Sequence, residues 1–151
     1  VLVIHGEELW IYYSAFGGDP ANRCLPWTKN GMYCNGATGL AKLRRDGFVS
    51  MNGTGRLTTR QLIMHGKTGM MVNVNGSVTV KILSPEGKTL AVSEPFTGDS
   101  TNQPIRFPQF DVSRLNDTPF RLELAVSGRL YAFGFTDATG DCGGAHAAGR
   151  L

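Results

Sequence analysis

The chain has 151 residues, of which 41% are hydrophobic and 18% charged, and its formal net charge at pH 7 is +3. These values fit a globular domain with one hydrophobic core and exclude a disordered or collagen-like chain. Basic residues form no run longer than the pair Arg44–Arg45, so nucleic-acid binding is not expected. No apolar run approaches the roughly 18 residues of a membrane-spanning helix, so no membrane partner is expected.

The first residues predict a β-hairpin over residues 1–16. Its second arm, residues 8–16, is rich in the aromatic and β-branched side chains that fit a pleated surface. Because the first arm starts at Val1 without an initiator methionine, the chain is expected to be a segment of a longer protein. Residues 17–36 are rich in Gly, Pro and Asn and predict a long loop.

Residues 37–136 predict a series of short antiparallel strands, and residues 137–151 a flexible tail. Apolar and polar side chains alternate in three segments, residues 77–82, 120–126 and 131–135. Four methionines are expected to fill gaps in the core: Met51, Met64, Met70 and Met71. The predicted fold is all-β, an antiparallel β-sandwich of the jelly-roll or lectin-like kind, preceded by the hairpin and the long loop.

Turn residues punctuate these strands. Asn75-Gly76 predicts a type I′ hairpin turn, because both residues tolerate positive φ, and Ser127-Gly128 is expected to join the last two strands. Ser84-Pro85-Glu86-Gly87 predicts a type I turn. Asp111 is placed to cap a single helical turn over Val112–Leu115.

Cysteines and glycosylation sequons bear on the cellular compartment. Cys24 and Cys34 are candidates for a disulfide that closes the long loop, and the alternative is that these two and Cys142 are unrelated thiols. Asn-x-Ser/Thr sequons occur at Asn52, Asn75 and Asn116, all expected in turns. Their number favours a secreted glycoprotein.

The sequence contains no catalytic signature. A Gly-x-Ser-x-Gly elbow, a phosphate loop, an HExxH pair and a dinucleotide fingerprint are all missing, so no catalytic residue and no cofactor is predicted. Without a CxxC pair and with scattered histidines, no metal site is predicted either. Asp46, Asp99 and Asp111 lie beside Gly, Ser or strand ends, which favours turn and capping roles over the paired carboxylates of a glycosidase.

Aromatic residues in the long loop are the candidate glycan-binding residues. Trp27 and Tyr33 offer ring faces that can stack on a sugar, and Asn35 offers an amide for its hydroxyl groups. The alternative is that both rings pack the loop onto the sheet.

A resemblance extends this reading. Residues 39–50, Gly-Leu-Ala-Lys-Leu-Arg-Arg-Asp-Gly-Phe-Val-Ser, resemble a segment of proteins similar to glycoside hydrolase families 32 and 43. In those proteins the segment follows the last blade of a five-bladed β-propeller and opens a C-terminal β-sandwich. Residues 8–13, Glu-Leu-Trp-Ile-Tyr-Tyr, resemble the closing propeller strand. Later landmarks of the sandwich are similar to residues 57–62, 72–76, 97–100 and 130–133.

The resemblance implies a noncatalytic, carbohydrate-associated β-sandwich that is accessory to a glycoside-hydrolase-like propeller. The catalytic carboxylates of such enzymes lie in blades that would precede Val1, so only a longer parent protein could be a glycoside hydrolase. This hypothesis predicts an exposed apolar face where the blades dock. The alternatives are a stand-alone lectin-like protein, a structural or oligomerisation domain, and a small hydrolase with two carboxylates in a pocket. A homo-oligomer through the N-terminal edge strand is compatible with either binding hypothesis.

Overall fold

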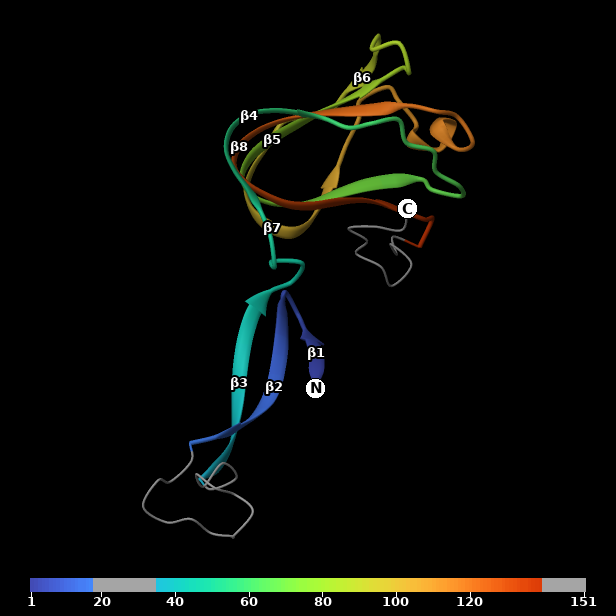
Figure 1. The fold of residues 1–151 in the computed structure, drawn as a ribbon. Coiled ribbons are helices and arrows are strands. Elements are labelled where there is room, and N and C mark those ends of the chain that lie inside the picture. Colours follow the sequence, from blue (N-terminus) through green and yellow to red (C-terminus); the bar gives the residue numbers. More distant parts are fainter. Residues whose placement is uncertain (18–34, 140–151) are drawn as a thin grey trace. The chain divides into compact units, whose positions relative to one another are not determined.

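The structure, a computed structural model, describes residues 1–17 and 35–139. The chain divides into two compact units, Val1–Arg45 and Asp46–Leu151 (Figure 1). Unit 1 holds a three-stranded sheet and unit 2 a five-stranded sheet, and all strand pairs within them are antiparallel. Among the described residues the only helical element is one 3-10 turn. The all-β antiparallel fold class is therefore confirmed.

Unit 1 is built on a long hairpin with a third strand at its side. Its strands are β1 (Leu2–His5), β2 (Glu8–Phe16) and β3 (Gly36–Arg44). Gly6, with φ 60°, turns β1 into β2, as the hairpin over residues 1–16 requires. Strand β3 was expected to belong to the sandwich. It instead pairs with β2 along its whole length, from Glu8 opposite Arg44 to Phe16 opposite Gly36. The two units therefore divide after Arg45.

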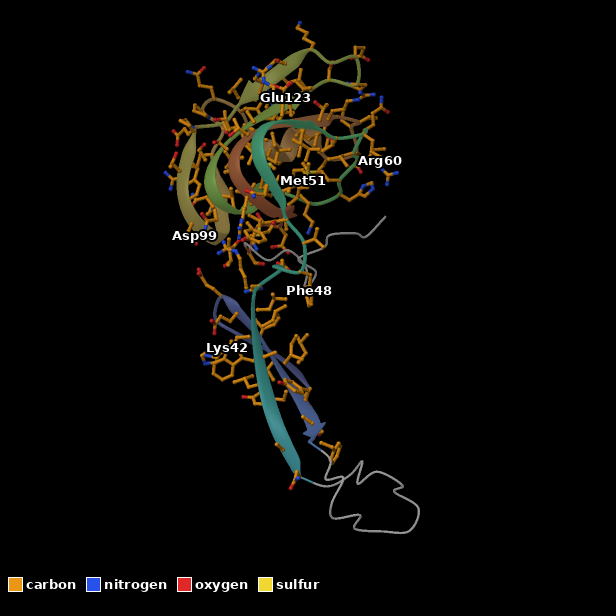
Figure 2. The ribbon with its side chains drawn as sticks, turned by 60° about the vertical axis from the view of Figure 1, so that its left-hand side comes forward. Lys42, Phe48, Met51, Arg60, Asp99 and Glu123 are labelled. Atoms are coloured by element: carbon orange, nitrogen blue, oxygen red, sulfur yellow. The ribbon has the colours of Figure 1, made fainter. Side chains whose placement is uncertain are left out.

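Unit 2 contains five strands and a helical turn. They are β4 (Met51–Thr58), β5 (Gly69–Leu83), β6 (Thr89–Val92), β7 (Phe96–Ile105), η1 (Val112–Leu115) and β8 (Arg121–Thr136). The last strand, β8, lies between β4 and β5, while β6 and β7 share the other side of β5. β4 is therefore the edge strand on one side of this sheet. Figure 2 labels Met51 on β4 and Asp99 on β7.

The two longest strands, β5 and β8, bend back on themselves (Figure 1). Phe120 directly precedes β8 and Phe135 lies near its end, yet their rings meet edge to face with centroids 5.6 Å apart. A straight strand of this length would separate them by about 50 Å at roughly 3.4 Å per residue. The bend therefore brings the two halves of the sheet together across one core, an arrangement consistent with a sandwich.

A row of glycines crosses the sheet at the bend. Gly53 on β4 lies opposite Gly128 on β8, which lies opposite Gly76 on β5, which lies opposite Gly98 on β7. All four have positive φ, from 122° to 159°. A Cβ on Gly76 would stand 2.2 Å from the carbonyl oxygen of Ser127, so the strands approach too closely for a side chain.

This row corrects two turn predictions. Asn75-Gly76 and Ser127-Gly128 do not connect strands, because each lies inside a continuous strand, β5 or β8. The positive φ that Gly tolerates is used to bend the strand instead of reversing it. Both expected hairpins at these positions are wrong.

The core lies between the two halves of the bent sheet. Its fully buried side chains come mainly from β5 and from the start of β8: Val72, Val74, Val78, Val80, Ile82, Phe120, Leu122 and Leu124. The alternation predicted for residues 77–82 is confirmed. Strand β8 has a bulge at Tyr131, because Asn73 of β5 pairs with Ala132 while the next residue, Val74, pairs with Leu130. The extra residue moves the core-facing side chains of β8 from even to odd positions. Phe133 and Phe135 therefore pack inward.

The predicted turn over residues 84–87 and the predicted cap at Asp111 are both present. Gly87 N donates to Ser84 O at 2.9 Å, as a turn over residues 84–87 requires. Asp111 caps η1, since its Oδ1 accepts a hydrogen bond from Ser113 N at 2.9 Å. Three of the four methionines are buried, but Met51 is 58% exposed because it opens the edge strand β4. The core role predicted for Met51 is wrong.

Candidate functional site

The three-stranded sheet of unit 1 has one wholly apolar face. Cross-strand partners share a face in an antiparallel sheet, and side chains alternate between faces along each strand. The register therefore places these residues together: Leu2, Ile4, Leu9, Ile11, Tyr13, Ala15, Ala37, Gly39, Ala41 and Leu43. We call this set the apolar face. Only Leu9, on the middle strand β2, is buried, while Leu2, Ile4 and Tyr13 are 54%, 56% and 50% exposed.

The opposite face of the same sheet carries charged residues around a tryptophan. Trp10 stacks against His5 with ring centroids 4.2 Å apart, and Lys42 Nζ lies 4.5 Å from the centre of the Trp10 ring. Trp10 Nε1 donates to Glu8 Oε2 at 2.8 Å, and Lys42 Nζ lies 3.7 Å from the same oxygen. These contacts fix the indole ring between two strands and leave charged groups at its rim.

The fluorescence of Trp10 is expected to depend on pH through its hydrogen bond to Glu8. The hydrogen bond from Trp10, and secondarily the charge of Lys42, lower the pKa of Glu8 below its ordinary value. The contact therefore persists above the ordinary pKa and is lost as the pH falls through the lowered one. In a Trp27→Phe background, we expect Trp10 emission to change at a pH below the usual glutamate range and the Glu8→Gln variant to lack that change. A midpoint of the emission change at or above the usual glutamate range would contradict this expectation. The control is His5→Gln, which removes the imidazole stacked on the Trp10 ring and should keep the change.

The predicted loop site falls largely outside the described residues. Trp27, Tyr33, Cys24 and Cys34 all do, and neither the glycan-stacking nor the disulfide prediction is tested. Asn35 is described: it is exposed, has φ 53°, and its carbonyl oxygen accepts a hydrogen bond from Gly17 N at 3.2 Å. It therefore stands at the point where β2 and β3 separate.

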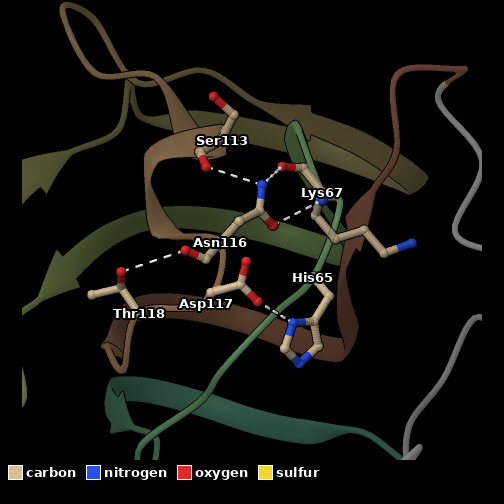
Figure 3. A network of polar contacts seen from close by, with 6 residues as sticks. All are labelled: His65, Lys67, Ser113, Asn116, Asp117 and Thr118. Atoms are coloured by element: carbon tan, nitrogen blue, oxygen red, sulfur yellow. Dashed lines mark hydrogen bonds and ion pairs between the residues drawn. The ribbon is translucent and has the colours of Figure 1, made fainter.

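The sequon residue Asn116 forms the centre of a polar network (Figure 3). Its Oδ1 accepts from Lys67 N at 2.9 Å, and its Nδ2 donates to Lys67 O at 2.8 Å and to Ser113 O at 2.9 Å. The side chain thereby joins the end of η1 to the segment before β5. Both Nδ2 hydrogens are used, and a glycan would replace one of them. Beside this network, His65 Nδ1 pairs with Asp117 Oδ1 at the surface.

The Asn116→Ala variant is expected to lose about 3 kcal/mol of unfolding free energy, because three hydrogen bonds disappear and the two backbone groups of Lys67 lose their partner. Thr118→Ala is the matched control. It also destroys the sequon, but it removes only a long contact of 3.4 Å to Asn116 O. Urea denaturation followed by circular dichroism measures both, and equal losses in the two variants would contradict the structural role of Asn116.

The other two sequons lie in strands, contrary to the prediction of turns. Asn52 is exposed on the edge strand β4. Asn75 is exposed on β5, where its Nδ2 donates to Asp99 Oδ2 at 2.8 Å. The side chains of Asn75 and Asn116 are thus hydrogen-bonded, whereas that of Asn52 makes no hydrogen bond to the described residues.

The three aspartates considered for catalysis are placed separately. Asp46, with φ 53°, lies where unit 2 begins, Asp99 accepts from Asn75, and Asp111 caps η1. Hydrogen bonding from Ser113 lowers the pKa of Asp111 and favours its ionised form as a cap. Within residues 1–17 and 35–139, no three His, Cys, Asp or Glu side chains gather as a metal site. In the same ranges no helix is long and apolar enough to cross a membrane.

A hollow of about 300 Å³ lies beside β7, lined by residues 94–96 and 103–106. Glu94 N donates to Arg106 O at 2.9 Å and ties its two walls together. The lining offers a carboxylate from Glu94, an amide from Gln103, a guanidinium from Arg106 and the ring of Phe96. Such a set can both donate to and accept from hydroxyl groups. No local sequence pattern predicts this hollow, because its two walls come from opposite ends of β7.

Comparison of the chain with protein-family models, with curated proteins and with solved structures gave no match.

Proposed function

We propose that this chain is a noncatalytic, carbohydrate-associated β-sandwich module of the jelly-roll kind, accessory to a glycoside-hydrolase-like propeller. The observation that carries the proposal is the apolar face of unit 1. The face exposes three large apolar side chains, those of Leu2, Ile4 and Tyr13. A continuous apolar surface of this kind is typical of a surface that packs against another protein layer. Residues 8–13 resemble a closing propeller strand, so the partner expected to cover this face is the neighbouring sheet of a propeller.

The polar content of the two faces agrees with one-sided docking. All positions of the apolar face on β1, β2 and β3 lack charge, while Glu8, Lys42 and Arg44 lie on the other face. Antiparallel sheets that pack on a core on one side and meet water on the other have this division. The proposal includes a secreted protein.

Intact-mass analysis of the native gene product tests the proposal first. A polypeptide much larger than 16.3 kDa is expected, since the propeller must be joined to this module. A native product of 16.3 kDa plus glycans would overturn the accessory role. Glycosidase assays on the 151-residue chain are expected to show no hydrolysis, and hydrolysis would show that the module is itself catalytic.

Surface variants of the larger product then test the docking face. Ile4→Lys and Tyr13→Lys put charges on the apolar face, whereas Val3→Lys and Tyr12→Lys put them at exposed positions of the opposite face. Limited proteolysis is expected to release this module from the first pair of variants and not from the second. Equal resistance of all four variants would mean that the apolar face is not the docking surface.

The hollow at β7 favours a second candidate, a stand-alone lectin-like protein. Its ring, carboxylate, amide and guanidinium are the groups that bind sugars. In a glycan-array screen of the 151-residue chain, Arg106→Ala and Glu94→Gln would then abolish binding, while the exposed Arg129→Ala would keep it. Loss of binding in Trp27→Ala or Tyr33→Ala instead would assign the site to the long loop.

A further inference from the structure

The edge strand β4 directs backbone groups away from the rest of its sheet. Thr59 N donates to Leu122 O at 2.9 Å in the register that pairs β4 with β8. Because such bonds alternate along an antiparallel pair, the odd-numbered residues of β4 bond to β8. The even-numbered residues Asn52, Thr54 and Arg56 therefore turn their N–H and C=O groups outward. On that side the described chain provides no further strand.

Beside this edge the core is open. A cavity of about 180 Å³ is lined by Met51 to Leu57 of β4 and by Val126 and Leu130 of β8. Its position follows from the sequence, because Gly53 and Gly55 occupy two inward positions of β4 and contribute no side chains. A Cβ on Gly55 would meet nothing within 4 Å. Next to these glycines, Met51 leaves 58% of its surface exposed.

The bend restricts what can pair with this edge. Every strand that crosses the bend has a glycine there, aligned with the glycine of its neighbour. A strand added beside β4 must therefore place a residue that tolerates positive φ opposite Gly53. A second β4, running antiparallel, does so when Gly53 faces Gly53. In this arrangement a two-fold axis passes between the two Gly53 residues and relates the sheets of the two copies, so both sheets bend in the same direction.

From this alignment we propose that two copies of the chain associate through β4, with Gly53 of one copy opposite Gly53 of the second. In this register Thr54 lies opposite Asn52 of the second copy, so the outward N–H and C=O groups of both residues face each other. Met51 lies opposite Gly55 of the second copy and fills the gap in its core. Arg56, the charged residue of β4, lies opposite Ser50, so no like charges face each other.

Analytical ultracentrifugation of the 151-residue chain tests the association. Sedimentation equilibrium is run in an Ile4→Lys background, so that the apolar face of unit 1 does not contribute. A monomer–dimer equilibrium is expected, and Thr54→Pro should abolish it by removing an outward N–H that the monomer does not use. Thr54→Ala is the control: it also loses the 2.9 Å contact between Thr54 Oγ1 and Ser127 Oγ, but it keeps the N–H and should still dimerise.

A second variant keeps the test independent of the fold of Thr54→Pro. Met51→Lys changes an exposed side chain in the monomer but would bury a charge against Gly55 in the dimer. It is therefore expected to fold normally, by circular dichroism, and to sediment as a monomer. A native chain that is monomeric at every concentration, or a dimer that survives both Thr54→Pro and Met51→Lys, would overturn the proposal.

Disulfide trapping tests the register. In the double variant Met51→Cys/Gly55→Cys, each new cysteine faces its counterpart in the second copy, and oxidation should yield a covalent dimer with linked peptides. The two positions are about 13 Å apart along one strand, too far for a bond within a chain. Met51→Cys/Leu57→Cys is the matched control and should form no such link. Efficient trapping of the control instead would overturn the register centred on Gly53.

Discussion

The Gly128→Ala variant is expected to lose about 4 kcal/mol or more of unfolding free energy. The new Cβ would stand 2.3 Å from the carbonyl oxygen of Asn75 and 2.9 Å from the Cα of Gly76. Both obstacles are backbone, so the clash is relieved only by separating β8 from β5. The φ of 122° at Gly128 adds conformational strain for any residue with a side chain.

Two further glycines serve as controls for this variant. Gly87→Ala has a φ of 92° but an open surrounding, so it should show the conformational cost alone, about 1–3 kcal/mol. Gly55→Ala has neither problem and should change stability by less than about 1 kcal/mol. Urea denaturation followed by far-ultraviolet circular dichroism gives the three values. If Gly128→Ala costs no more than Gly87→Ala, the close approach of β5 and β8 at the bend is wrong.

Phe120→Ala is expected to cost about 3–5 kcal/mol, because the ring is fully buried and its removal leaves a cavity where the two halves of the sheet meet. Phe48→Ala removes the same group from a site that is 67% exposed, so it should change stability by less than about 0.5 kcal/mol. The two variants thus compare one chemical change in two environments.

A double-mutant cycle adds the contact across the bend. Phe120 and Phe135 should couple by about 0.5–1.5 kcal/mol beyond their separate losses, as expected for rings that meet edge to face. Additive losses from Phe120→Ala and Phe135→Ala would mean that the ends of β8 do not meet in solution.

Features set by neighbouring residues could be predicted from the sequence. The hairpin over residues 1–16, the turn over residues 84–87 and the cap at Asp111 depend on local backbone chemistry, and all three are present. The alternation of residues 77–82 likewise named core side chains correctly, because a strand with one buried side repeats every two residues.

The bend could not be predicted, for a physical reason. A glycine with positive φ can reverse a chain at a hairpin or bend a strand that continues, and Asn75-Gly76 is compatible with both. The choice is made by Gly53, Gly98 and Gly128, which are distant in sequence and align only when the strands pair. The hollow at β7 likewise depends on segments from the two ends of that strand, which Glu94 N and Arg106 O join.

The candidate surfaces show a similar division. The first two strands carry apolar residues at consecutive positions, so their sequence does not show which side of the sheet is uncharged. The apolar face is defined by the register, which places Leu43 of β3 beside Leu9 of β2. The assignment of β3 to the sandwich failed because the segment that follows the long loop returns to β2. Met51 has the inward position expected of a core residue, and its exposure results from the place of β4 at the sheet edge.

The position of β8 has a consequence for synthesis of the protein. This strand comes last in the sheet but lies between β4 and β5, and it pairs Met51 with Leu130. During synthesis on the ribosome, β4 therefore cannot pair with β8 until almost all of unit 2 has been made. Sheets with such distant pairings fold slowly and expose their unpaired strands meanwhile. A chain that stops before Arg121 has no strand to join β4 to β5, so premature termination there would leave material for chaperones and proteases.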